Sequence, residues 1–90
     1  MKKQLSFAGT LSERLALPGE SLGELKLSVV GAWRALIENH RGLLCCTEEL
    51  VSVRGGGGSL SLEGTGLRIE AMNERELLVI GQLSQAKWEA

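Results

Sequence analysis

Apolar and polar residues alternate along most of the chain beyond residue 19. Leu25, Leu27 and Val29 are separated by Lys26 and Ser28. An alternation with a period of two is typical of a strand that has one face buried and the other in water. Further candidate strands follow at 33–38, 43–47, 51–54, 59–63, 67–71, 77–80 and 82–88, and most of them alternate in the same way. About eight short strands at this spacing predict an all-β fold, a small antiparallel β-sandwich.

Two of these strands carry further information about the core. Trp33, Ala35 and Ile37 fall on one face of their strand, which we expect to be the inward face. Segment 77–80 is apolar at every position, so both of its faces are expected to be covered and the strand to be central. The alternation changes phase at Gly81, which predicts a bulge or bend there.

The connections between strands contain residues that tolerate unusual backbone conformations. Asn39 and Gly42 can take positive φ at little steric cost, so a turn is expected around them. A β-branched residue in place of Gly42 should therefore harm folding. Gly64 and Gly66 predict another tight turn, and together with Gly42 and Gly81 they are the expected structural turn positions.

Four consecutive glycines, Gly55 to Gly58, could suggest a phosphate-binding loop. Such a loop requires a lysine followed by serine or threonine at the start of a helix. Here the segment 59–63 follows, and it alternates as a strand. The run is therefore interpreted as a flexible hairpin tip, and the core faces of the adjoining strands must fix the register.

Residues 1–18 differ in character from the rest and are expected to form a separate N-terminal segment before a single β-sandwich domain over residues 19–90. Leu11 and Leu15 have helical spacing, and Thr10 with Glu13 matches a capping box, so a short helix is predicted over 11–17. Pro18 would end it. The helix is expected to pack on the sheet, and peripheral membrane contact by this segment is the alternative.

Composition limits the range of functions. The chain has 90 residues, a formal net charge of −1, and only 3% aromatic residues. A nucleic-acid binder needs a concentrated basic face or aromatic stacking platforms, so nucleic acid is not an expected partner. The longest apolar run has four residues, from Leu77 to Ile80. A membrane-spanning helix needs about 20, so a chain that does not itself cross a membrane is expected.

No residue pattern completes a catalytic or metal-binding set. His40 is the only histidine, and it has no nucleophile and orienting acid in a recognisable arrangement. Cys45 and Cys46 are adjacent and lack the paired spacing of zinc ligands, so buried free thiols are expected. We therefore expect no enzymatic activity and no cofactor. Trp88 could belong to the core or be a partly exposed anchor for a partner.

The segment Ile37 to Leu44, Ile-Glu-Asn-His-Arg-Gly-Leu-Leu, resembles a specific stretch of a known family. Together with Leu15 to Pro18, Leu67 to Ile69 and Glu76 to Gly81, it is similar to the YabP/YqfC family of sporulation proteins, and within it to the YqfC branch. The similarity extends from about residue 11 to residue 88. It implies a small β-sandwich-like protein of endospore-forming bacteria, made in the mother cell, without an established activity or cofactor.

The resemblance also sets expectations for partners. Family members look like cytosolic companions of membrane proteins, which for this branch would be a YqfD-like protein. The expected function is therefore a non-enzymatic sporulation protein that binds a membrane or spore-envelope partner, in the cytoplasm of the mother cell or peripherally at the forespore membrane. Glu38, Asn39, His40, Arg41 and Trp88 are the candidate contact residues.

Two other hypotheses stay open from the sequence. Unpaired strand edges could join copies of the chain into a homo-oligomer or a layer of the spore envelope. A small-ligand-binding domain that uses His40 and a nearby pocket is the third hypothesis.

Overall fold

The computed structural model describes residues 25–90 in full and, before them, the backbone of residues 2–6 and 12–15. Every regular element in these ranges is a β-strand. The strands are β1 (Lys2–Ser6), β2 (Ser12–Leu15), β3 (Lys26–Val30), β4 (Arg34–Glu38), β5 (Leu43–Cys46), β6 (Leu50–Gly55), β7 (Gly58–Met72) and β8 (Glu76–Glu89). Six of them lie within residues 25–90. The prediction of an all-β fold is confirmed.

The strands form one antiparallel sheet, in the order β2-β3-β4-β8-β7-β6-β5, with β1 also paired to β8. The predicted sandwich of eight short strands is therefore wrong. Segments 59–63 and 67–71 are parts of the single 15-residue strand β7, and segments 77–80 and 82–88 are parts of the 14-residue strand β8. The prediction that 77–80 lies centrally is confirmed, since β8 pairs with β4 on one side and β7 on the other.

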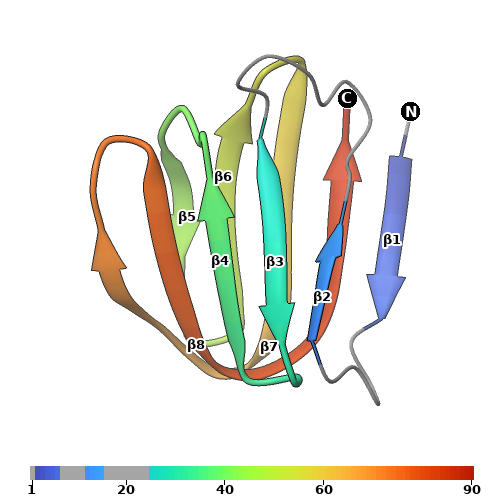
Figure 1. Cartoon of the computed structure of the whole chain (residues 1–90), viewed down its shortest axis with the longest axis vertical. Coiled ribbons are helices and arrows are strands. Elements are labelled where there is room, and N and C mark those ends of the chain that lie inside the picture. The colour runs from blue at the N-terminus through green and yellow to red at the C-terminus, as the bar shows by residue number, and fades with distance from the viewer. Residues whose placement is uncertain (1, 7–11, 16–24) are drawn as a thin grey trace.

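The sheet curls over itself because β7 and β8 bend together (Figure 1). Their register shifts between Thr65 and Arg68, opposite Gly81. At this shift Gly66 has a φ of 62° and Gly81 a φ of 135°, which are backbone conformations that residues with a side chain rarely adopt. The predicted bulge at Gly81 is confirmed, whereas the tight turn predicted at Gly64 and Gly66 is a bulged part of β7.

The bulge in β7 is stabilised by the β5–β6 turn. The carbonyl oxygen of Glu49 accepts a hydrogen bond from the Gly64 amide at 3.1 Å, and that of Glu48 accepts one from the Leu67 amide at 2.8 Å. These bonds satisfy amide groups that no longer pair regularly with β8. Because a buried amide without a partner is costly, the turn supports the bend.

The core lies between the two halves of the curled sheet. Its completely buried side chains alternate with outward residues on each strand, and the alternation changes phase across the bend. They come from β3 and the residue before it, β4, β6, β7 and β8, and they are Leu25, Leu27, Val29, Ala35, Ile37, Val51, Val53, Leu60, Leu62, Leu67, Leu77, Val79, Leu83, Ala86 and Trp88. Trp88 is the one aromatic residue in this described core.

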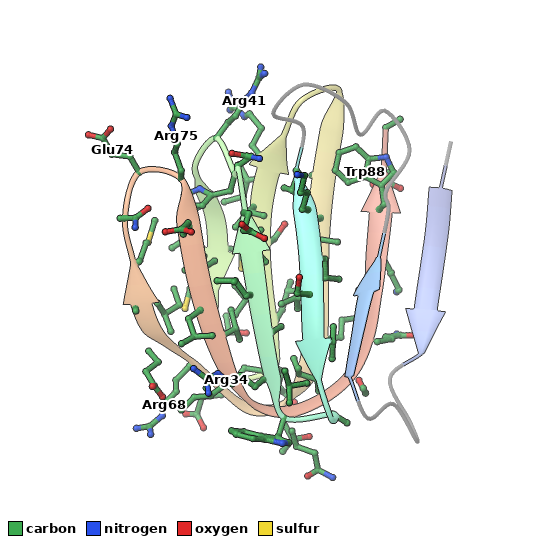
Figure 2. The ribbon with its side chains drawn as sticks, in the orientation of Figure 1. Arg34, Arg41, Arg68, Glu74, Arg75 and Trp88 are labelled. Atoms are coloured by element: carbon green, nitrogen blue, oxygen red, sulfur yellow. The ribbon has the colours of Figure 1, made fainter. Side chains whose placement is uncertain are left out.

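The four glycines form the hairpin that joins β6 to β7, as the sequence predicted, and this hairpin packs against the core. Gly55, the last residue of β6, pairs with Gly58, the first residue of β7. A Cβ atom on Gly55 would lie 3.1 Å from two atoms of the Trp88 indole, and one on Gly58 would lie 2.8 Å from a third. The hairpin thus lacks side chains where the indole ring of Trp88 lies (labelled in Figure 2).

Several local predictions need correction. The helix predicted over 11–17 is not present where the chain is described, because Ser12–Leu15 is strand β2; the remainder of that helix, and the boundary at residue 18, lie outside the described residues. Trp33 is in the β3–β4 turn and 55% exposed, so it does not face the core. The cysteines are not buried: Cys45 is half-buried and Cys46 exposed, on the edge strand β5. No described helix is long and apolar enough to cross a membrane.

Candidate functional site

The predicted contact residues lie at one end of the molecule, where two connections meet. Glu38 ends β4 and pairs with Glu76, the first residue of β8. The β4–β5 connection, residues 39–42, therefore lies beside the β7–β8 loop, residues 73–75. We call these two connections, with the flanking Glu38 and Glu76, the corner. Figure 2 shows Arg41, Glu74 and Arg75 projecting from it.

His40 joins the two connections from within the corner. Its side chain is only 4% exposed. The amide of Gly42 donates a hydrogen bond to Nδ1 at 3.1 Å, and Nε2 is 3.0 Å from the carbonyl oxygen of Asn73. Since Nδ1 accepts, the proton of the neutral ring is on Nε2 and is donated to Asn73. The ring thus connects two loops that are 33 residues apart in the chain.

Main-chain bonds hold the β4–β5 connection on both sides. The His40 amide donates to the carbonyl oxygen of Arg75 at 3.2 Å, and the Arg41 amide donates to that of Arg54 at 2.7 Å. The Arg54 amide donates in turn to the carbonyl oxygen of Gly42 at 2.8 Å. Asn39 has a φ of 65° and Gly42 a φ of 134°, which confirms that this turn uses the positive-φ conformations expected from the sequence.

The β7–β8 loop is closed by Asn73. Its Oδ1 accepts hydrogen bonds from the amides of Arg75 at 2.8 Å and Glu76 at 2.7 Å, and its main-chain amide donates to the Glu76 carbonyl oxygen at 2.9 Å. An asparagine that bonds to the backbone two and three residues onward is a common way to stabilise a tight turn. Glu74 and Arg75 are thereby presented at a rigid tip and are exposed.

A shallow hollow of about 450 Å³ lies at the corner. It is lined by Glu38, Asn39, Asn73, Glu74, Arg75 and Glu76. The lining is charged and polar, whereas pockets for small ligands are mostly apolar with a few polar groups. A surface of this kind is better suited to a charged segment of another macromolecule than to a small apolar ligand.

The corner offers no assembled chemistry. Both ring nitrogens of His40 are engaged in hydrogen bonds, so the imidazole can act as a base or a ligand only by giving up one of them. In the part of the chain that the structure describes, no three His, Cys, Asp or Glu side chains gather as a metal site would require.

The structure separates the predicted contact residues into two groups. Glu38 and Asn39 line the hollow, and Arg41 is exposed beside it. His40 and Trp88 are 4% and 3% exposed, so neither presents its ring to a partner, and Trp88 belongs to the core. Asn73 and Arg75 also belong to this site and were not among the residues expected there from the sequence. The asparagine that opens the polar connection after β7 is the signal that could have indicated a turn there.

Replacing His40 with alanine should lower the free energy of unfolding by about 2–3 kcal/mol, because two buried hydrogen bonds are lost and their backbone partners are left unpaired. Thermal unfolding measures the loss, and hydrogen exchange should show faster opening of residues 73–76. His40→Asn can still accept from Gly42, and His40→Gln can still reach Asn73, so each should lose less. Alanine with wild-type stability would contradict the role of the ring.

Comparison with known proteins adds one finding. The model of a protein family described as the YabP family matches residues 21–90, which include the corner and all of β3 to β8. No curated protein and no solved structure matches the chain.

Proposed function

The chain belongs to the YabP family, and from this premise we propose that it acts in spore formation without catalysis, by binding a protein partner. Family membership is consistent with a sporulation-related protein. We further propose that the chain belongs to the YqfC branch and acts in the cytoplasm of the mother cell or at the forespore membrane. The partner would be a membrane or spore-envelope protein, and a YqfD-like membrane protein fits the resemblance.

The observation that supports this proposal is the rigid, charged corner. Arg41 and Arg75 are exposed on two connections that His40 and main-chain bonds hold together. Exposed side chains on a well-fixed backbone lose little further entropy when they bind. The corner therefore resembles a recognition surface more than a catalytic pocket.

The charges of the corner suggest what it recognises. Arg41 and Arg75 each carry a guanidinium that can bind a carboxylate through two parallel hydrogen bonds. Glu74 projects beside Arg75, on the side away from Arg41 (Figure 2), and would repel a purely acidic surface. A partner segment with two acidic residues and a nearby basic one matches this arrangement.

Reversing both arginines, Arg41→Glu with Arg75→Glu, should abolish recovery of the partner while the protein remains folded. A tagged copy is expressed in sporulating cells, crosslinked, purified and analysed by mass spectrometry. Wild type should recover a membrane or envelope protein, with crosslinks at residues 38–42 and 73–76.

The matched control reverses two exposed charges in the β5–β6 turn, Glu48→Arg with Glu49→Arg. This variant should recover the same partner as wild type. Recovery of no membrane or envelope protein by wild type would count against the function, and equal recovery by the corner variant would count against the site.

A further inference from the structure

The outward face of one half of the curled sheet has an apolar middle between charged ends and is not covered by any described residue. Four strand segments form it: β3, β4, the first part of β8 and the last part of β7. Across them Leu36 is opposite Leu78, and Leu78 is opposite Ala71, so these three side chains form a continuous row. We call this surface the outer face and this row its central row.

Two hollows on the outer face follow the central row. One, of about 230 Å³, is lined by Ser28, Val30, Arg34, Leu36 and Leu78. The other, of about 180 Å³, lies on the β7 side, where Ala71 lines it together with Leu36 and Leu78. On this face Val30 is 46% exposed, and Leu36 and Leu78 are half-buried. A continuous apolar row that is open to solvent is a candidate interaction site.

The charges on either side of the central row differ in sign. On one side the register places Arg34 and Arg68 opposite Ile80, one on each neighbouring strand. Both are exposed, and no carboxylate pairs with either within the described residues. On the other side, Glu38 and Glu76 are direct partners, and Lys26 lies opposite Glu38 on β3, so the two glutamates leave this end net acidic. Figure 2 shows Arg34 and Arg68 together at the end of the molecule opposite Glu74.

We propose that a second copy of this chain stacks on the outer face, related by a two-fold axis that runs along the central row. A rotation about that axis turns the face over and exchanges its two ends. Arg34 of each copy then lies over Glu38 of the other, and Arg68 lies within one strand of Glu76, while Leu36 and Leu78 lie near the axis. A two-fold interface brings the same patch of both subunits together, so the patch must be complementary to itself.

The charge pattern distinguishes this arrangement from the other two-fold stacking. An axis parallel to the strands would also turn the face over, but it would keep each end in place. Arginines would then lie over arginines and glutamates over glutamates, and like charges across an interface are costly. The pattern thus selects one occupant and one orientation.

The area of the outer face sets the expected affinity of the dimer. Four strands at about 4.8 Å spacing and five residues at about 3.3 Å give a footprint of roughly 19 by 17 Å. This is well below the ~800 Å² per partner of a standard interface. The dimer should be weak, with a dissociation constant in the micromolar range, and sensitive to salt because its ion pairs lie at the rim.

The dimer shares Glu38 and Glu76 with the edge of the partner-binding corner but not Arg41 or Arg75, and its test is independent of spore formation. Analytical ultracentrifugation of the full chain, from about 1 µM to about 500 µM, measures the equilibrium. Wild type should pass from monomer to dimer. The dissociation constant of the dimer should rise at least tenfold when NaCl is raised from about 0.05 M to about 0.5 M.

Charge-reversed variants test the orientation. Arg34→Glu with Arg68→Glu makes both ends of the face acidic, and Glu38→Arg with Glu76→Arg makes both basic. Each alone should stay monomeric, and an equimolar mixture should form a one-to-one dimer, because each end then meets its opposite. Circular dichroism verifies that the variants are folded. If the second pair fails to fold, the first pair and the salt series still decide.

Three results would overturn the proposal. Wild type could remain monomeric over the whole range. The Arg34→Glu, Arg68→Glu variant could dimerise as strongly as wild type, which would indicate association through another surface such as the β5 edge. The folded acidic and basic variants could remain monomeric on mixing, which would reject the two-fold orientation.

Discussion

Substituting Gly81 with alanine should lower the free energy of unfolding by about 4 kcal/mol or more, a large part of the ~5–13 kcal/mol expected for a domain of this size. Gly81 has a φ of 135°, and its added Cβ would lie 2.6 Å from the carbonyl oxygen of Gly66 and 2.8 Å from the Cα of Leu67. Both obstacles are backbone atoms of the paired strand. They can move only if the bend between β7 and β8 opens, and the whole sheet is built around that bend.

Gly42→Ala is the matched control, because Gly42 has nearly the same φ, 134°, but no atom within 4 Å of an added Cβ. Alanine there should cost only the backbone strain, about 1–3 kcal/mol. Urea unfolding of both variants separates the cost of backbone strain from the cost of the steric clash at Gly81. Equal losses at the two positions would show that the close approach at Gly81 does not matter.

The inward and outward alternation of the strands could be predicted because it is a local property. Residues 25–29 and 35–37 alternate in burial as their polarity suggests. The continuity of β7 through Gly64 to Gly66 could not be predicted in this way. Glycines of that spacing are compatible with a turn or with bulges, and the choice depends on the Glu48 and Glu49 carbonyls, which accept hydrogen bonds from β7. That contact involves residues 15–19 positions away.

The same limit applies to the corner. The positive φ values at Asn39 and Gly42 follow from residue type, and the structure confirms both. The partner of His40 does not follow from residue type, since Asn73 lies 33 residues further along the chain. A lone histidine in a polar turn therefore suggested a surface contact, whereas pairing of β4 with β8 buries its ring between two loops. Only the strand order, which a single sequence does not specify, brings these groups together.

The outer face illustrates how register turns scattered residues into a surface. Arg34 and Arg68 are separated in the sequence by half of the domain, yet both lie opposite Ile80. Along the chain the charges are interspersed and the net charge is −1, so nothing in the sequence indicated that basic residues gather at one end of a face. The sheet sorts them into a basic side and an acidic side of one apolar row. This segregation follows from pairing, so a charge count over the sequence could not reveal it.

Replacing Trp88 with alanine should lower the free energy of unfolding by about 3–5 kcal/mol, the usual cost of removing a large buried aromatic side chain. Trp88 is 3% exposed, and its indole lies against the glycine hairpin between β6 and β7. The indole nitrogen is buried, and no described residue forms a hydrogen bond with it. Trp88→Phe should therefore cost much less than alanine, because phenylalanine keeps most of the apolar contact and removes an unpaired donor. A loss as large as that of alanine would contradict this account.

A double-mutant cycle links Trp88 to the hairpin glycines. A Cβ on Gly55 would lie 3.1 Å from two ring atoms of the Trp88 indole and 3.0 Å from Leu25. Gly55→Ala should destabilise wild type by about 1–3 kcal/mol through overpacking. In the Trp88→Ala background the same change should be close to neutral, since the methyl group then enters the space that the ring has left. Chemical unfolding of the four proteins gives the coupling, expected to be about 1 kcal/mol or more. Additive losses would show that Gly55 is required by its backbone conformation and not by the ring.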